Sequence, residues 1–256
     1  MALILCIETA TEVCSVALVR DQQLLGIRES SARNVHSAML TVFTDEIIKS
    51  SGVQFVDLDA IAVSMGPGSY TGLRIGVATA KGLCYALDKP LIAVPTLQAM
   101  AVGINYELKI KNYESGDEVQ SAKCKMQSAK LKSVALVCPM IDARRMEVYC
   151  AVFDHYDQEI RKVRAEIIDE YSFQKFLADN QVVFAGEGAD KCKPLLADHP
   201  NALFLDGFQA SARFMAPLAS EKFREKQFEN LAYFEPFYLK DFVAGKPRVK
   251  GLHDAY

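Results

Sequence analysis

Short apolar runs separated by polar turns make up the first thirty residues of the chain. Residues 2–8, 13–19 and 23–29 each have the length of a strand, and the links between them are short. Consecutive strands with short links predict an antiparallel meander. A helix is expected from Val35 to about Ser50, where apolar residues recur at the spacing of a broad helical face.

The segment from residue 59 to residue 87 combines a strand, a glycine-rich turn and a helix. Ala60 to Met65 is a short apolar run, Gly66-Pro67-Gly68-Ser69 interrupts it, and a helical pattern extends from Thr71 to Leu87. Such a turn before a helix N-terminus is suited to binding an anion. However, the turn has neither the Gly-Lys pair of a Walker loop nor the glycine spacing of a dinucleotide fingerprint.

A stripe of small residues follows the predicted helix. Gly72, Gly76, Ala80 and Cys84 recur every four residues and therefore lie on one face. Glycine lowers helix stability by about 1 kcal/mol relative to alanine, so two glycines in one helix require a structural reason. Two alternatives remain open at this point: a tight contact inside the chain's own fold, which the stripe alone favours, or the close approach of a partner helix.

The second half of the chain repeats the layout of the first. A strand near 91–94 and a helix ending at about Val102 complete the first unit. Strands are expected again from residue 133, and the second unit also includes a helix over 171–178 and a long helix over about 210–227. A meander that continues into βα units, present twice, predicts an α/β fold of the actin-like ATPase superfold, with two lobes that each contain a mixed sheet and helices.

Four regions follow from this pattern. Residues 1–104 are the expected N-terminal lobe and residues 133–235 the expected C-terminal lobe. Between them, residues 105–132 are rich in lysine and are interpreted as a polar insertion. Residues 236–256 are expected to form an extended tail with basic residues in its middle.

Composition narrows the possible functions. The chain has 256 residues, a formal net charge of −3 and seven cysteines. A nearly neutral chain is not built to hold a polyanion over its whole surface, so any contact with nucleic acid is expected to be local or to belong to a partner. An odd number of cysteines without a Cys-x-x-Cys pair is typical of reduced, buried thiols. Without a basic leader or a run of about 18 apolar residues, the protein is expected to be cytoplasmic and not in a membrane.

The candidate chemistry is sparse. No two of the four histidines are four residues apart, and no Gly-x-Ser-x-Gly elbow is present, so no metal, cofactor or hydrolase triad is expected. Glu8 ends the first strand, where actin-like ATPases place an acid near phosphate, although a structural role is the default. A local charge network is also a possibility at the lobe boundary, from Asp142, Arg144, Arg145 and Glu147.

Five ordered motifs resemble the bacterial TsaB (YeaZ) family. They are Ile7-Glu8-Thr9-Ala10-Thr11, Cys14-Ser15-Val16-Ala17-Leu18, the run from Gly66 to Gly76, Ile141-Asp142-Ala143-Arg144 with Glu147-Val148-Tyr149, and Glu235-Pro236-Phe237-Tyr238-Leu239. The resemblance extends along nearly the whole chain. The exception is the segment 105–132, which departs from the usual length of the family.

The resemblance implies a non-catalytic role in making N6-threonylcarbamoyladenosine (t6A) next to the anticodon of tRNA. In that family TsaB is the relative of TsaD, the subunit that transfers the threonylcarbamoyl group. The resemblance further implies that helices of the N-terminal lobe bind TsaD, that the ATPase TsaE joins the assembly, and that tRNA is reached only through the complex. It also implies a homodimer through the same surface when TsaD is absent.

With the family in view, the two helices of the N-terminal lobe become the expected partner surface. Their expected contact residues are Met39, Val42, Phe43 and Ile47, which supply bulk, and Gly72, Gly76 and Ala80, which allow close approach. Three alternatives remain open: a stand-alone actin-like ATPase or phosphotransferase, a glycoprotease-like peptidase, and direct binding of tRNA by the basic tail.

Overall fold

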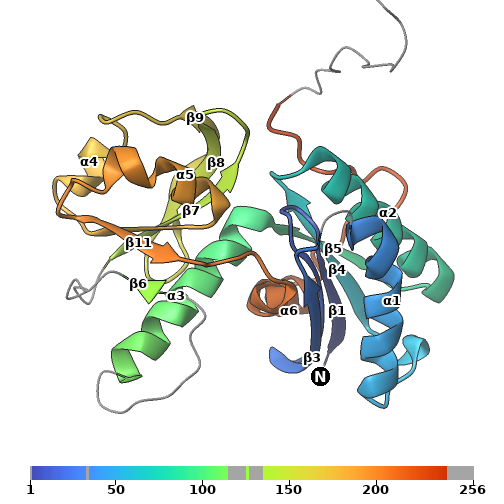
Figure 1. The fold of residues 1–256 in the computed structure, drawn as a ribbon. Coiled ribbons are helices and arrows are strands. Elements are labelled where there is room, and N and C mark those ends of the chain that lie inside the picture. The colour runs from blue at the N-terminus through green and yellow to red at the C-terminus, as the bar shows by residue number, and fades with distance from the viewer. Residues whose placement is uncertain (1, 33–34, 115–124, 127–134, 241–256) are drawn as a thin grey trace, which may run out of the picture.

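Two lobes, each built on one mixed sheet, make up the described part of the chain (Figure 1). The computed structural model describes residues 2–32, 35–114, 125–126 and 135–240. The lysines and arginine beyond residue 240, which the tail alternative invoked, lie outside these residues. None of the described helices has the length and apolar character needed to span a membrane.

The first sheet has five strands in the order β3-β2-β1-β4-β5. β1 pairs with β2 and β2 with β3 in antiparallel fashion, whereas β1 pairs with β4 and β4 with β5 in parallel. The predicted meander is therefore confirmed. The strands are β1 (Leu3–Glu8), β2 (Cys14–Arg20), β3 (Gln23–Ser30), β4 (Ala60–Gly66) and β5 (Leu91–Pro95).

Helices cover both faces of the first sheet. On one face lie α1 (Val35–Ser50) and α2 (Tyr70–Leu87), with the short 3₁₀ helix η1 (Phe55–Asp57) after α1. On the other face lie η2 (Ala212–Met215) and α6 (Ala216–Arg224), which pack against β1 although they follow it by about two hundred residues. The C-terminal part of the chain thus completes the core of the first lobe.

The prediction of a single long helix over residues 210–227 is wrong. The chain forms η2 and then the shorter α6, which has Pro217 in its first turn and ends at Arg224. Proline lacks the N–H that a continuous helix would need in its interior, so it starts a new helix here. Ser211 caps η2, because its hydroxyl accepts a hydrogen bond from the backbone N–H of Arg213 at 3.3 Å.

The second sheet repeats the plan of the first. Its order is β6-β11-β10-β7-β8-β9, in which β7, β8 and β9 form the meander and β10 and β11 add in parallel. The expected actin-like fold class, with a mixed sheet and helices in each lobe, is confirmed. The strands are β6 (Lys125–Met126), β7 (Leu136–Asp142), β8 (Glu147–Phe153), β9 (Glu159–Ile167), β10 (Val182–Ala185) and β11 (Ala202–Asp206), with α5 (Glu187–Leu196) beside them.

α3 (Thr96–Glu114) runs between the two sheets (Figure 1). The prediction that this helix ends near Val102 is wrong, and the expected boundary at 104/105 falls inside it. Ile104 and Leu108 are buried in the same cluster as strand residues of the second sheet, which explains why the helix continues. The remainder of the lysine-rich insertion lies outside the described residues except for β6, which pairs with β11.

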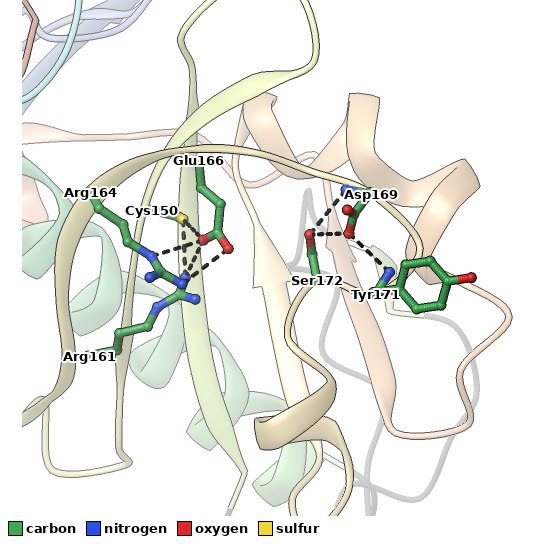
Figure 2. A network of polar contacts seen from close by, with 7 residues as sticks. All are labelled: Cys150, Arg161, Arg164, Glu166, Asp169, Tyr171 and Ser172. Carbon is green, nitrogen blue, oxygen red and sulfur yellow. Dashed lines mark hydrogen bonds and ion pairs between the residues drawn. The ribbon is translucent and has the colours of Figure 1, made fainter.

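α4 (Gln174–Leu177) is shorter than the helix expected over 171–178. Before it, a carboxylate oxygen of Asp169 accepts hydrogen bonds from the backbone N–H of Tyr171 at 3.0 Å and the hydroxyl of Ser172 at 2.9 Å (Figure 2). Phe173 then adopts a left-handed backbone conformation, so the helix begins only at the next residue.

A half-buried ion pair holds β8, β9 and this turn together. Figure 2 shows Arg161 of β9 directed at the Glu166 carboxylate and at the Cys150 sulfur of β8. The guanidinium lies 3.1 Å from the carboxylate and donates to the sulfur at 3.2 Å. The same guanidinium lies 4.4 Å from the centre of the Phe173 ring. The network therefore has a structural role in the second lobe.

Candidate functional site

A cleft of about 840 Å³ lies between the two lobes. The first lobe contributes the loop after β1 and the turn before α2, and the second contributes the β7–β8 turn and the start of α5. The chain from Phe237 to Lys240 also lines it. This is the position at which a two-lobed fold offers a site for a small molecule.

The glycine-rich turn, however, is packed against the loop after β1. A Cβ atom at Gly68 would overlap Ala10, and the backbone N–H of Ser69 donates to the Ala10 carbonyl oxygen at 2.7 Å. Ser69 also caps α2, since its hydroxyl accepts from the Gly72 N–H at 3.3 Å. The Ser69 N–H that a phosphate would need is thus already used within the chain.

Glu8 stabilises the loop after β1 and does not line the cleft. Its side chain is buried, and one carboxylate oxygen accepts a hydrogen bond from the backbone N–H of Ala10 at 2.6 Å. Burial raises the pKa of Glu8 to about 7, although hydrogen bonds from Ala10 and Ser64 oppose the shift. The geometry favours the structural interpretation of this acid, because its carboxylate supports the loop that packs on the glycine-rich turn.

Carboxylates from both lobes face each other across the cleft. Burial raises the pKa of Glu187, at the start of α5, to about 7, and the negative charges of Glu12 and Asp142 add to the shift. Among the described residues, no group of three or more histidine, cysteine or acidic side chains is arranged to hold a metal ion. The acidic side chains instead repel one another, which disfavours a bound polyphosphate.

The suggested charge network at the lobe boundary has different partners. Lys191 forms the ion pair with Asp142 and also donates to the carbonyl oxygens of Arg145 at 2.7 Å and Glu147 at 2.6 Å. The carboxylate of Glu147 pairs with Lys240. In the described part of the chain, therefore, lysines neutralise these acids, and the two arginines expected from the sequence do not.

The small-residue stripe of α2 packs against the chain's own loop. Cβ atoms at Gly72 and Gly76 would overlap the Thr9 carbonyl oxygen and hydroxyl, respectively, and Ala80 is fully buried. The internal-contact alternative is therefore correct, and the expectation that a partner helix approaches these residues is wrong. Thr9 could not be identified from the sequence as the residue that requires the glycines.

The bulky residues expected at the interface divide into buried and exposed ones. Phe43 and Ile47 belong to the core of the first lobe, with 7% and 0% of their surface exposed. Met39 is half-buried, and Val42 is 41% exposed. Only the last two therefore have side-chain surface available to a partner.

A further surface that the sequence interpretation missed lies on the exposed side of α2. It consists of Ile75, Ala78, Thr79, Gly82 and Ala86, which carry no charge and are exposed or half-buried. We call these residues, together with Met39 and Val42 of the adjacent α1, the outer α1–α2 face. At Gly82, a Cβ atom would have nothing within 4 Å. The three- and four-residue spacing of these uncharged positions was the available signal.

Comparison with known proteins shows which family the chain resembles. The family model described as TsaD, tRNA N6-adenosine threonylcarbamoyltransferase, matches residues 13–113. The curated protein TsaB of Escherichia coli (strain K12) is 30% identical over 252 residues, covering 95% of this chain and 96% of the relative. TsaB of Haemophilus influenzae is 27% identical and covers 95% of both chains.

Solved structures agree on the fold. YeaZ from Pseudomonas aeruginosa superimposes with a TM-score of 0.70 at 22% sequence identity, covering 93% of this chain and all of that one. A second structure, described as a protein of Pseudomonas aeruginosa with similarity to peptidase YEAZ, gives a TM-score of 0.71 at 22% identity. From the sequence match over almost its whole length, the chain belongs to the TsaB (YeaZ) family of tRNA threonylcarbamoyladenosine biosynthesis proteins.

Proposed function

We propose that this chain takes part in t6A synthesis on tRNA as a non-catalytic subunit that binds and activates TsaD. The observation that carries the proposal is the outer α1–α2 face, an uncharged surface on the lobe that matches the TsaD family model. The curated relatives that align over nearly the whole chain are named for the same pathway. TsaE joins the assembly, and tRNA is contacted through the complex.

The cleft supports a non-catalytic role. A phosphate bound between the glycine-rich turn and the loop after β1 would need free backbone N–H groups from these two segments. Here these two segments bond to each other through Ser69 and Ala10, and Glu8 is buried beneath them. The isolated chain is therefore expected neither to hydrolyse ATP nor to cleave peptides. Turnover by the isolated chain that Glu8→Gln abolishes would contradict this part of the proposal.

The outer α1–α2 face supports the partner role through its chemistry. Docking another helix pair on it buries mainly apolar and small side chains, each Å² of apolar area contributing about 25 cal/mol before the costs of association. The exposed carboxylate one turn further along α1, Glu46, is already paired with Arg28 at 3.1 Å. The open position at Gly82 lets a partner backbone come close to α2. A second copy of the chain fits the same surface, which gives a homodimer when TsaD is absent.

The decisive variant is Gly82→Leu. Because nothing lies within 4 Å of a Cβ at this position, the leucine fits the isolated chain, yet it projects into the space that a docked partner would occupy. We expect unchanged folding, at least tenfold weaker binding of TsaD by calorimetry, and a matching loss of t6A formation in a reconstituted assay with TsaD and TsaE.

Ala178→Leu is the matched control. Ala178 is also exposed, but it follows α4 in the second lobe. This variant should bind TsaD as the wild type does. If Gly82→Leu and Ala178→Leu both bound TsaD with wild-type affinity, α2 would not be part of the interface.

A further inference from the structure

After α6 the chain returns across the first lobe as residues 229–240, which form one turn at 231–233 and no helix, and which we call the strap. Figure 1 shows its C-terminal part as a red coil beside α2. The backbone N–H of Glu229 donates to the Leu91 carbonyl oxygen of β5 at 2.9 Å. Further along, the Lys81 ammonium of α2 donates to the carbonyl oxygens of Ala232 at 3.3 Å and Phe234 at 3.2 Å. The strap is thus fixed to the first lobe over much of its length.

The strap is seated most closely where β4 ends. The N–H of Phe237 donates to the Met65 carbonyl oxygen at 2.7 Å. A Cβ atom at Gly66 would lie only 2.6 Å from the Phe237 carbonyl oxygen, so the absence of a side chain there is what lets the strap approach. A substitution at this glycine would therefore displace the strap.

Contacts between aromatic rings and an arginine fix the next residue, Tyr238. The Tyr238 ring lies 5.0 Å from the Tyr70 ring of α2, and the Arg74 guanidinium lies 4.1 Å from the centre of the Tyr70 ring. Arg74 also donates through Nε to the Tyr238 hydroxyl at 3.1 Å. One arginine therefore joins the two tyrosines and holds the strap at the mouth of the cleft.

Two residues later the strap reaches the second lobe. Lys240 forms an ion pair with Glu147 at the start of β8, and its ammonium lies 6.0 Å from the centre of the Tyr149 ring. Phe237, Tyr238, Leu239 and Lys240 all line the cleft. Within four consecutive residues, the chain is bonded to the first lobe at one end and to the second lobe at the other.

We propose that the strap is a clamp that sets the separation of the two lobes across the cleft. α3 and the segment leading into η2 also connect the lobes, but both cross between the two sheets and neither lines the cleft. The clamp holds the cleft in its closed arrangement, and breaking the contact between Lys240 and Glu147 shifts the lobes towards an open arrangement. The inference concerns the isolated chain and does not depend on TsaD.

The distance between one spin label on each lobe, measured by double electron–electron resonance, tests this clamp. Labels are placed at Ser37→Cys on α1 and Glu170→Cys after β9, both exposed positions. The background carries Cys124→Ser, because the other six cysteines are buried and resist labelling. Lys240→Glu and Glu147→Lys each place like charges at the contact, and the double variant restores an opposite pair.

We expect each single reversal to shift the ratio of long to short label distances by about two- to fivefold, the range for loss of an exposed ion pair. The double variant should return the wild-type distribution, which simple misfolding of either single variant would not do. Tyr238→Ala should open the cleft as well, while Lys162→Glu, on the exposed side of β9, should not. Unchanged distances in both Lys240→Glu and Tyr238→Ala would overturn the proposal.

Discussion

Replacing Gly76 by alanine tests whether the small-residue stripe of α2 is needed inside the chain. At this position a Cβ atom would overlap the Thr9 hydroxyl and lie 3.3 Å from the Thr9 Cβ and 3.4 Å from its Cγ2. Thr9 is fully buried, and a β-branched side chain has few alternative rotamers. Of the two other rotamers, one puts the methyl group in place of the hydroxyl, and the other turns a heavy atom into space that a hydrogen occupies in this fully buried site. We therefore expect the backbone to move.

Two opposing terms determine the size of the effect. Alanine stabilises a helix interior by about 1 kcal/mol relative to glycine. Overpacking of a close-fitting core costs about 1 to 3 kcal/mol. Because the overlap at Gly76 involves a buried side chain that cannot move away, we take the upper part of that range and expect a net loss of about 1 to 2 kcal/mol. For a chain of this size, this lowers the Tm by roughly 2 to 8 °C.

The assay is urea and thermal unfolding of four proteins: the wild type, Gly76→Ala, Thr9→Ala and the double variant. The buried Thr9 hydroxyl has no hydrogen-bond partner among the described residues, so its removal costs little, and the double variant should recover wild-type stability. Gly82→Ala is the control, since its Cβ meets nothing within 4 Å and should stabilise the chain by up to about 1 kcal/mol. If Gly76→Ala were as stable as that control, Gly76 would not be packed closely against Thr9.

Three other measurements follow from burial and charge. Burial raises the pKa of Glu8 from 4.5 to about 7, so the folded state binds this proton more tightly than the unfolded state does. The stability gained from the protonated carboxyl is therefore lost as pH rises from 4.5 to 7. Glu8→Gln should raise the free energy of unfolding at pH 8 but not at pH 4. Glu187→Gln should also raise the free energy of unfolding at pH 8, but by a smaller amount, because this side chain is only partly buried. A larger effect than that of Glu8→Gln in the same urea titrations would contradict this order of burial. Ile47→Ala should cost about 2 to 5 kcal/mol, whereas Val42→Ala should change stability by less than about 0.5 kcal/mol and weaken TsaD binding; equal urea midpoints for the two would refute the division into core and surface.

The strands of the meander could be predicted to within about one residue. The apolar runs expected at 2–8, 13–19 and 23–29 correspond to β1, β2 and β3, and α1 has the expected bounds. These elements are short, buried or amphipathic, and flanked by turn residues, so local pattern determines them. The repeat of the same plan in the second lobe then made the actin-like fold class predictable.

Long-range packing explains what the sequence could not show. α3 continues past its expected end because its second half is held against elements distant in the sequence. At Gly103, for example, a Cβ atom would overlap the ring of Phe214 in η2. Likewise, the residue that requires a glycine at position 76 is Thr9, in a loop that precedes α2 by more than sixty residues. No periodicity along one helix identifies a contact of this kind.

The three glycines within α2 therefore have different causes, and this difference is the best argument for a partner. Gly72 and Gly76 are explained by the backbone and side chain of Thr9. Gly82 has a helical backbone, and a side chain there would enter open space, so nothing inside the described chain compensates for the roughly 1 kcal/mol that glycine costs a helix. A glycine that weakens its own helix on an exposed, uncharged face is accounted for by something that approaches from outside. The close approach inferred from the stripe thus moves to the opposite side of the same helix.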